Sequence, residues 1–325
     1  MLRAATLPRP PAALRRLTAT PARRVKDDFD WHTPIDRSRW FFCETLTPLY
    51  YAPIYQELAP DHRRRYNQLT GMLANELISL LESEFLDAAL TAVATADPAD
   101  SELREAVIRF RDDEARHADA WDRLNRLSEP GWYQTRQPRL VTVSAPVRAL
   151  SRFIARHPLL VPVVFWVQLV QEERSVEISR RCMRVDGDRI EPRYAAVYAA
   201  HLHDEVRHVQ IDRHLIERFY RPRSPAVRHV TARLLRGFVS RLLLTPGRSS
   251  FAVVRRLVEE SPELAPLESR IRAQLRRLTA SDEYHRMMYS RESTPVTFDL
   301  FDRFEEFHQM QHVLRAYRPR PVTQS

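Results

Sequence analysis

The sequence Asp-Glu-x-Arg-His occurs twice, at residues 113–117 and 204–208, and it gathers side chains that could do chemistry. On a helix, a Glu and a His three residues apart point into the same space. Two such pairs, joined by one Glu from each of two further helices, form the di-iron site of a four-helix bundle. A single pair arises often by chance, but two copies that share the Asp and the Arg indicate a real site. The four ligands predicted from these copies are Glu114, His117, Glu205 and His208.

The first motif lies in a helix that we predict over about residues 101–127, with Ser101 as its N-cap. Apolar residues recur there in steps of three and four, and Glu114 and His117 continue the apolar stripe. A carboxylate that faces a core is costly unless it is paired or bound to a metal. The alternative is that both side chains lie at the edge of the stripe and meet solvent.

The second motif lies in a helix predicted to begin near Pro192 and to end at about residue 220. His201 precedes Glu205 by four residues and His208 by seven, so three ligand-type side chains share one face. This arrangement is typical of half of a metal site, although a polar helix face rich in histidine would look similar. We therefore add His201 to the predicted ligands.

A helix predicted over residues 62–95 should supply one further Glu. Glu84 follows several leucines at helical spacing, so it is expected to face a core. Glu82 also has apolar neighbours, and Glu76 is a third candidate. Spacing alone does not decide among the three.

The fourth helix, predicted over residues 160–184, carries Glu172 and Glu173. Glu172 shares a face with apolar residues, whereas Glu173 is followed one turn later by Glu177, so we choose Glu172. Four such glutamates would be neutralised by two ferrous ions, whereas without metal the cluster would be strongly destabilising. Carboxylate and imidazole ligands suit iron or manganese, and no thiolate is placed to favour zinc.

Asp113 and Asp204 directly precede the Glu of each motif. We expect each to accept a hydrogen bond from the far N–H of a ligating histidine, which would fix its tautomer. Arg116 and Arg207 could form ion pairs with these aspartates. Asp212, one turn beyond His208 on the same face, could play the same role as the two aspartates. Ordinary surface charge is the alternative for the two aspartates.

The composition predicts an all-α protein, because only 5 of the 325 residues are glycine and alternating strand patterns are nearly absent. We expect a ferritin-like four-helix bundle with additional C-terminal helices over about residues 224–316, as a single domain from 27 to 325. Residues 1–26 contain seven basic residues and no acidic one. They are predicted to form a disordered basic arm, with a transit peptide or an early start codon as alternatives.

Net charge and hydropathy exclude several classes of function. The net charge is +9, but without the seven basic residues of the arm it is only +2, so no nucleic-acid-binding face is expected. The most apolar run, residues 159–170, is too short to span a membrane. Two cysteines are too few for a disulfide framework, so we expect an intracellular, cytoplasmic protein.

At these positions the chain resembles the p-aminobenzoate N-oxygenase family of ferritin-like non-haem di-iron oxygenases. The family's last ligand helix has the pattern His-x-x-x-Glu-x-x-His, which stands here over residues 201–208. The segment Leu69-Thr70-Gly71-Met72, twelve residues before Glu84, and Val170-Gln171-Glu172 also look like the family's. The resemblance covers roughly residues 45–220 and favours Glu84 over Glu82, whereas His203 and the Arg of the second motif depart from the family pattern.

The resemblance implies an enzyme with two iron ions and O2 as co-substrate that oxidises the nitrogen of a small-molecule amine in specialised metabolism. The products would be a hydroxylamine, nitroso or nitro compound. An external electron donor of the ferredoxin or flavin-reductase type is expected, and a homodimer is expected by family analogy only. The alternatives are a di-iron hydroxylase or desaturase, a radical-generating subunit, a ferritin-like iron-binding protein, or a helical interaction protein without metal.

Overall fold

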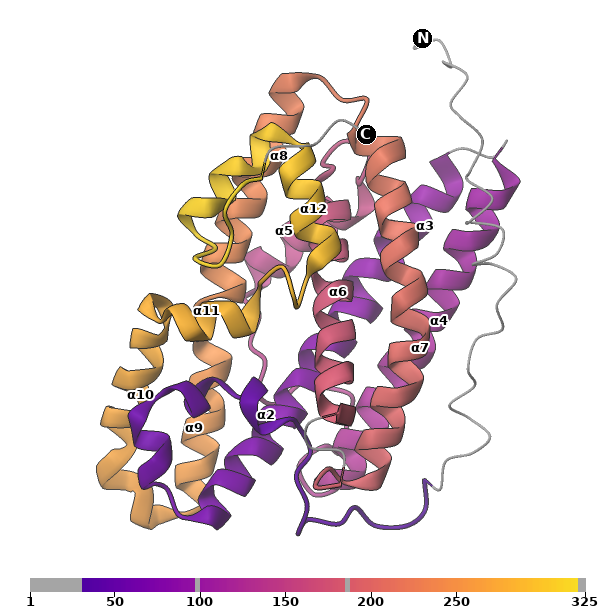
Figure 1. Ribbon diagram of the computed structural model, residues 1–325. Helices are drawn as coiled ribbons and strands as arrows, with labels where there is room; N and C mark the ends of the chain where they lie inside the picture. Colours follow the sequence, from indigo (N-terminus) through magenta and orange to yellow (C-terminus); the bar gives the residue numbers. More distant parts are fainter. Residues whose placement is uncertain (1–30, 97–99, 185–187, 321–325) are drawn as a thin grey trace.

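The computed structural model describes residues 31–96, 100–184 and 188–320, and within these ranges the regular elements are all helices (Figure 1). An isolated β-bridge joins Trp40 and Ile190. The predicted all-α, ferritin-like bundle is therefore confirmed. The predicted basic arm, residues 1–26, lies outside the described residues. No helix in the described ranges is long and apolar enough to cross a membrane.

The first long helix of the bundle contains a π-helical turn. It consists of α2 (Pro60–Leu80), a π-helix over Leu81–Leu86 and α3 (Asp87–Ala96). Leu81 and Asp87 keep helical backbone angles, so the three segments continue one another without a break. A π-helical turn holds an extra residue, so the side chains beyond its start rotate relative to those of an uninterrupted α-helix.

The other three bundle helices agree with the sequence analysis apart from small differences at their ends. They are α4 (Ser101–Ser128), α6 (Val163–Arg184) and α7 (Pro192–Leu215), and a π-helix over Ile216–Tyr220 extends α7. Pro192 is the first residue of α7, as predicted. The prediction of Ser101 as N-cap is wrong, because Asp100 caps α4 by accepting a hydrogen bond from the Leu103 N–H.

Six shorter helices complete the fold. They are α5 (Ala145–Arg156), α8 (Pro225–Phe238), α9 (Arg248–Glu260), α10 (Glu268–Arg277), α11 (Asp282–Met288) and α12 (Pro295–Arg303). Figure 1 shows α9 and α10 beside one end of α2, whereas α8 and α12 lie towards the other end of the molecule. The elements after α7 therefore pack along the bundle beside α2 and α6, towards both of its ends (Figure 1).

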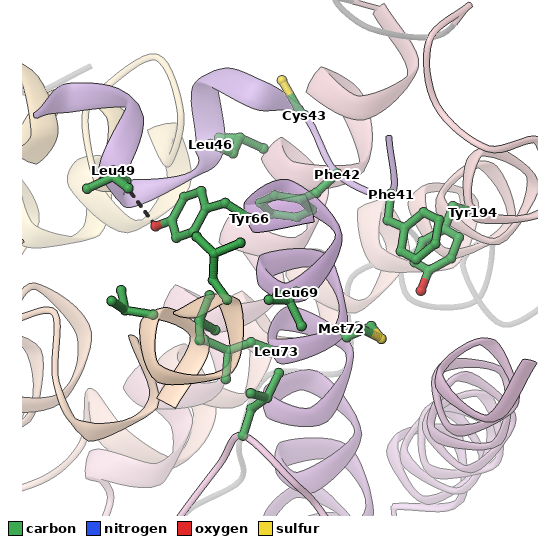
Figure 2. Packing of buried hydrophobic residues seen from close by; sticks show 14 of the residues in the cluster. Phe41, Phe42, Cys43, Leu46, Leu49, Tyr66, Leu69, Met72, Leu73 and Tyr194 are labelled. Carbon is green, nitrogen blue, oxygen red and sulfur yellow. Dashed lines mark hydrogen bonds between the residues drawn. The ribbon is translucent and has the colours of Figure 1, made fainter. Parts of the chain in front are cut away.

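The segment before α2 packs over the bundle through aromatic side chains (Figure 2). The ring of Phe41 stacks on that of Tyr194 in α7, with centroids 4.4 Å apart. The Tyr66 hydroxyl of α2 accepts a hydrogen bond from the backbone N–H of Leu49, at 3.1 Å. This segment therefore ties α2 to α7 and fixes the position of the helix that continues to Glu82.

Gly71 allows this segment to lie directly on α2. A Cβ at Gly71 would lie 3.1 Å from the Cβ of Phe41 and 3.3 Å from that of Phe42. One turn earlier, the buried Asn67 side chain accepts hydrogen bonds from the N–H groups of both phenylalanines and donates one to the Phe42 carbonyl. The Asn67 amide thus holds the backbone before α2 by hydrogen bonds, and Gly71, which has no side chain, leaves room for that backbone one turn later.

Candidate metal centre

The bundle brings together buried Glu and His side chains from the π-helical turn after α2, from α4 and from α7 in two overlapping groups. In each group, one ligand atom per residue lies within 4.8 Å of the others. The first group is Glu82, His117, His201 and Glu205, and the second is Glu114, His117, Glu205 and His208. Because both groups contain His117 and Glu205, they form one site with two adjacent positions.

One carboxylate oxygen of Glu205 lies at the middle of this site. Its Oε1 is 3.1 Å from His201 Nε2, 3.2 Å from His208 Nδ1 and 3.4 Å from His117 Nδ1. Glu114 of α4 faces the same space, with its Oε1 at 2.9 Å from His208 Nδ1. The two copies of the motif therefore point at each other across the interface of α4 and α7, as their spacing predicted.

The atoms that face the middle of the site approach one another without hydrogen-bond geometry. Both carboxylate oxygens of Glu114 and of Glu205 lack a hydrogen bond, and so do the Nδ1 atoms of His117 and His208. Buried polar atoms are almost always hydrogen-bonded, so this many orphaned atoms at one point require an explanation. Their lone pairs converge on a shared space, which fits the donor set of bound metal ions.

The far nitrogens of two histidines are held by the aspartates of the opposite motif. His117 Nε2 lies 3.2 Å from Asp204 Oδ2, and His208 Nε2 lies 3.3 Å from Asp113 Oδ2. Arg207 donates to both acids, at 2.6 Å to Asp113 and 2.9 Å to Asp204. A carboxylate on Nε2 favours the tautomer with its proton there, which leaves the Nδ1 lone pair directed into the site.

The two aspartates stay ionised despite their burial. Burial would raise the pKa of Asp113, but His208 and Arg207 hold it well below the usual range. Burial likewise opposes ionisation of Asp204, and His117 lowers its pKa. Arg116 also bonds Asp113, at 35% side-chain exposure, so this arginine connects the buried acid to the surface.

His201 enters the site with its other ring nitrogen. Its Nε2 faces Glu82 Oε1, at 3.3 Å, and its Nδ1 lies 3.4 Å from the hydroxyl of Ser179 on α6. Ser179 therefore contacts the ring nitrogen of His201 that faces away from the site, as Asp204 and Asp113 do for His117 and His208. The sequence analysis did not identify Ser179, although it lies seven residues, or two turns, beyond Glu172 and hence on the same face of α6.

The structure places Glu82, and not Glu84, in the site. Glu82 is 3% exposed, whereas the Glu84 side chain is 30% exposed and lies 3.2 Å from Arg152 and 3.5 Å from Arg148 on α5. Helical spacing left both residues open and the family resemblance favoured Glu84, but both residues lie in the π-helical turn, which changes the direction of each side chain. Glu76 is engaged elsewhere, because it accepts backbone N–H groups around Leu140.

On α6 the structure brings Glu172 to the site. Glu172 is buried, with its Oε2 at 3.7 Å from His208 Nδ1. Glu173 points away and accepts hydrogen bonds from the N–H groups of Val296 and Thr297, so it holds the first turn of α12. Of the two neighbouring glutamates, Glu172 is thus the one that faces the candidate centre.

A comparison with known protein families gives a match over most of the chain. The family model described as P-aminobenzoate N-oxygenase AurF matches residues 8–282, a range that contains all four long helices of the bundle. The chain belongs to the AurF family. A search of curated proteins found no match. The AurF match extends beyond the part where the sequence resemblance was apparent, roughly residues 45–220, and includes α8 to α10.

Electrostatics in this AurF-family site favour bound cations. Burial and the nearby Glu114 raise the pKa of Glu82 to about 7, and burial with Glu205 raises the pKa of Glu172 well above its usual range. Burial also opposes the charge on Glu205, yet His201, Glu172 and His208 hold its pKa well below normal. The negative charges of these glutamates oppose one another inside the bundle, and bound divalent metal ions would neutralise them together.

Proposed function

We propose that the protein is a non-haem di-iron oxygenase that uses O2 to oxidise the nitrogen of a small-molecule amine. The observation that carries the proposal is the pair of overlapping ligand groups that share Glu205 and His117. Two adjacent positions with carboxylate and imidazole donors, set within a four-helix bundle, correspond to the donor set of ferritin-like di-iron proteins. Membership of the AurF family supports the oxygenase activity and the amine substrate.

In this proposal Glu82 and His201 belong to one iron position, and Glu114 and His208 to the other. Glu205 lies between the two positions, and Glu172 approaches the second from α6. Two bound irons would supply the electrons that activate O2. Glu84 is not part of this set, since its carboxylate forms ion pairs with Arg148 and Arg152 near the surface.

The residues around the ligands set proton positions and keep the site rigid. Asp204 and Asp113 hold the Nε2 protons of His117 and His208, so both Nδ1 atoms remain free to bind metal. Arg207 compensates the charge of both aspartates, so the pair can remain ionised inside the bundle. The amine would then meet O2 in a site whose ligands cannot change tautomer or rotate freely.

The remaining parts of the proposal depend on the family more than on the geometry. We propose hydroxylamine, nitroso or nitro products, an external electron donor of the ferredoxin or flavin-reductase type, and a role in specialised metabolism in the cytoplasm. A homodimer is proposed on the same ground. p-Aminobenzoate, which the family description names, is the first substrate to try.

The test combines metal analysis with product analysis. Protein reconstituted with ferrous iron should bind about two irons per chain, and after reduction it should convert p-aminobenzoate or a related arylamine to products that carry oxygen from labelled O2. Glu205→Ala should lose both iron and product, whereas Glu84→Ala should retain both. Less than one metal per chain after reconstitution would contradict the di-iron site. Full iron with O2 consumption but no oxidised amine across a panel of arylamines would contradict N-oxygenation alone.

A further inference from the structure

Two contacts at the site fix the register between α6 and α7. Glu172 Oε2 approaches His208 Nδ1, and the Ser179 hydroxyl approaches His201 Nδ1. Moving seven residues forward on α6 therefore corresponds to moving seven residues back on α7, so the helices are antiparallel with a constant offset. Seven residues are two turns, so both contacts lie on the same face of each helix.

The same register places Gln168 opposite Asp212. Gln168 precedes Glu172 by one turn on α6, and Asp212 follows His208 by one turn on α7. Both side chains are buried, with Gln168 1% exposed and Asp212 fully buried. From the register we infer that they lie opposite each other, one helical turn from the candidate metal centre.

Neither member of this pair has a protein partner. Both side-chain polar atoms of Gln168 and both carboxylate oxygens of Asp212 lack a hydrogen bond to any part of the chain that the structure describes. A buried amide or carboxyl group without a hydrogen-bond partner destabilises the folded state, so two facing ones would destabilise it considerably. Polar groups at this depth are normally satisfied by protein or by ordered water.

The neighbouring helices offer apolar side chains at this level. Phe110 on α4, one turn before Glu114, stacks on the ring of His208 with centroids 3.9 Å apart. Leu86, one turn after Glu82, is completely buried. The groups with which Asp212 interacts electrostatically, His208, Glu114 and Glu205, all belong to the candidate metal centre. The protein therefore supplies two polar side chains here without supplying hydrogen-bond partners for them.

We propose that Gln168 and Asp212 form a buried binding site for water beside the candidate metal centre. Water suits this pair because it both donates and accepts, as the amide also does, and buried waters typically make about three hydrogen bonds. Phe110 packs on His208 one turn away and Leu86 is buried in the same core, so the pair is proposed for a molecule as small as water. The site takes a molecule of the size of water, and its two protein ligands come from adjacent antiparallel helices.

This water has a second use if the oxygenase function holds. Reduction of O2 consumes protons, and most side chains packed near Gln168 and Asp212 along α6 and α7 are apolar. A water molecule hydrogen-bonded to Asp212 would hold an exchangeable proton one turn from the ligands. That role rests on the proposed function, whereas the water site itself does not.

A high-resolution crystal structure of the iron-loaded protein tests the site directly. We expect a water peak within hydrogen-bond distance of an Asp212 carboxylate oxygen and of the Gln168 amide group. A direct Asp212–Gln168 hydrogen bond without water, or a dry gap between them, would overturn the proposal. Neither result depends on oxygenase activity, so failure of the water site can be told apart from failure of the proposed function.

A double-mutant cycle provides an independent measurement of the pair. Asp212→Leu and Gln168→Leu each remove one of the two side chains that hold the water, so the other side chain loses its hydrogen-bonded water as well. The shift in melting temperature of the double variant should therefore differ from the sum of the two single shifts. The matched control is Gln171→Leu, because Gln171 lies on the same helix but accepts from the Tyr289 hydroxyl. Its effect should add to that of Asp212→Leu. Additive shifts for Gln168 as well would contradict a shared water.

Metal content separates this site from the ligand set. Asp212→Asn keeps a hydrogen-bonding side chain of the same shape, so it should retain the water and bind as much iron as the unchanged protein. A loss of iron from Asp212→Asn would show that the Asp212 carboxylate supports metal binding itself, as a ligand or through its charge, which would overturn the assignment of the pair to water alone.

Discussion

The motif helices and the helix that carries Glu82 deliver their side chains to the same centre in different ways. α4 and α7 are regular α-helices across their motifs, and each presents its Glu and His from positions three residues apart. Glu82 comes from a π-helical turn between α2 and α3. A regular helix sets side-chain direction by spacing alone, whereas a π-helical turn leaves that direction dependent on where the extra residue falls.

The two regions also differ in how much of the centre depends on them. α4 and α7 exchange contacts reciprocally, because each motif's Asp holds the other motif's His. Glu205 and His117 belong to both ligand groups, whereas Glu82 belongs to one. Changes in the motif helices should therefore disturb both metal positions, and changes at Glu82 should disturb mainly one.

The largest expected effect is that of Glu205→Ala. Its Oε1 lies within 3.4 Å of a ring nitrogen of each of the three histidines, so its removal should weaken binding at both positions. We expect iron affinity to fall by more than the roughly 10–100-fold typical of losing a residue behind the ligands. Metal analysis after dialysis against a weak chelator measures this loss. Retention of two irons per chain would contradict the central place given to Glu205.

Glu82→Ala should remove one of the two irons, and Glu84→Ala is its matched control. Glu84 lies two residues away in the same π-helical turn, but its carboxylate pairs with Arg148 and Arg152 in a partly exposed position. Such pairs contribute at most about 1 kcal/mol, so Glu84→Ala should leave iron content unchanged. The reverse result, iron loss from Glu84→Ala alone, would restore the choice made from the sequence.

Asp204→Asn should have a smaller effect than either ligand change. The amide has the same shape as the carboxylate but can no longer stabilise the Nε2 proton of His117 as an anion. We expect iron affinity to fall about 10–100-fold, and Asp113→Asn should do the same through His208. Equal losses for the two variants would support the reciprocal exchange between motifs. An unchanged affinity would show that these aspartates serve the fold only.

What could be predicted from the sequence follows the same division. The convergence of the candidate ligands on α4 and α7 could be predicted because their helices are regular, and the direction of Glu172 could be predicted because an apolar face marks it. Spacing could not separate Glu82 from Glu84, because nothing in the local sequence indicates a π-helical turn, and the family resemblance then favoured Glu84. Ser179 was missed because a serine that bonds His201 across two helices has no signal beyond its spacing.

The fold around the site shows a similar limit. Helix spans were predictable from apolar periodicity and from prolines, as at the start of α7. The N-cap of α4 was placed one residue late, because Asp100 and Ser101 are both good caps and only geometry separates them. The contact between Gly71 and the chain before α2 is a tertiary feature, so the sequence gives only the glycine and not its reason.

The smallest effect on metal binding is expected from Gly71→Ala, which acts on the packing that positions α2. The new methyl would lie 3.1 Å from the Cβ of Phe41 and 3.3 Å from that of Phe42, so the segment must shift. Overpacking of this kind costs about 1–3 kcal/mol of folding free energy. Gly237→Ala is the control, since nothing lies within 4 Å of its added Cβ and helical alanine should stabilise by about 0.4–1 kcal/mol.

Denaturant unfolding of both glycine variants, together with their iron content, decides what Gly71 does. If the contact only holds the chain before α2, Gly71→Ala will lower stability and keep both irons. If it also sets how α2 continues into its π-helical turn, the same variant will lose iron at the Glu82 position while the motif helices keep theirs. That second outcome would tie the direction of Glu82 to packing more than two turns away and would extend the contrast between the two regions.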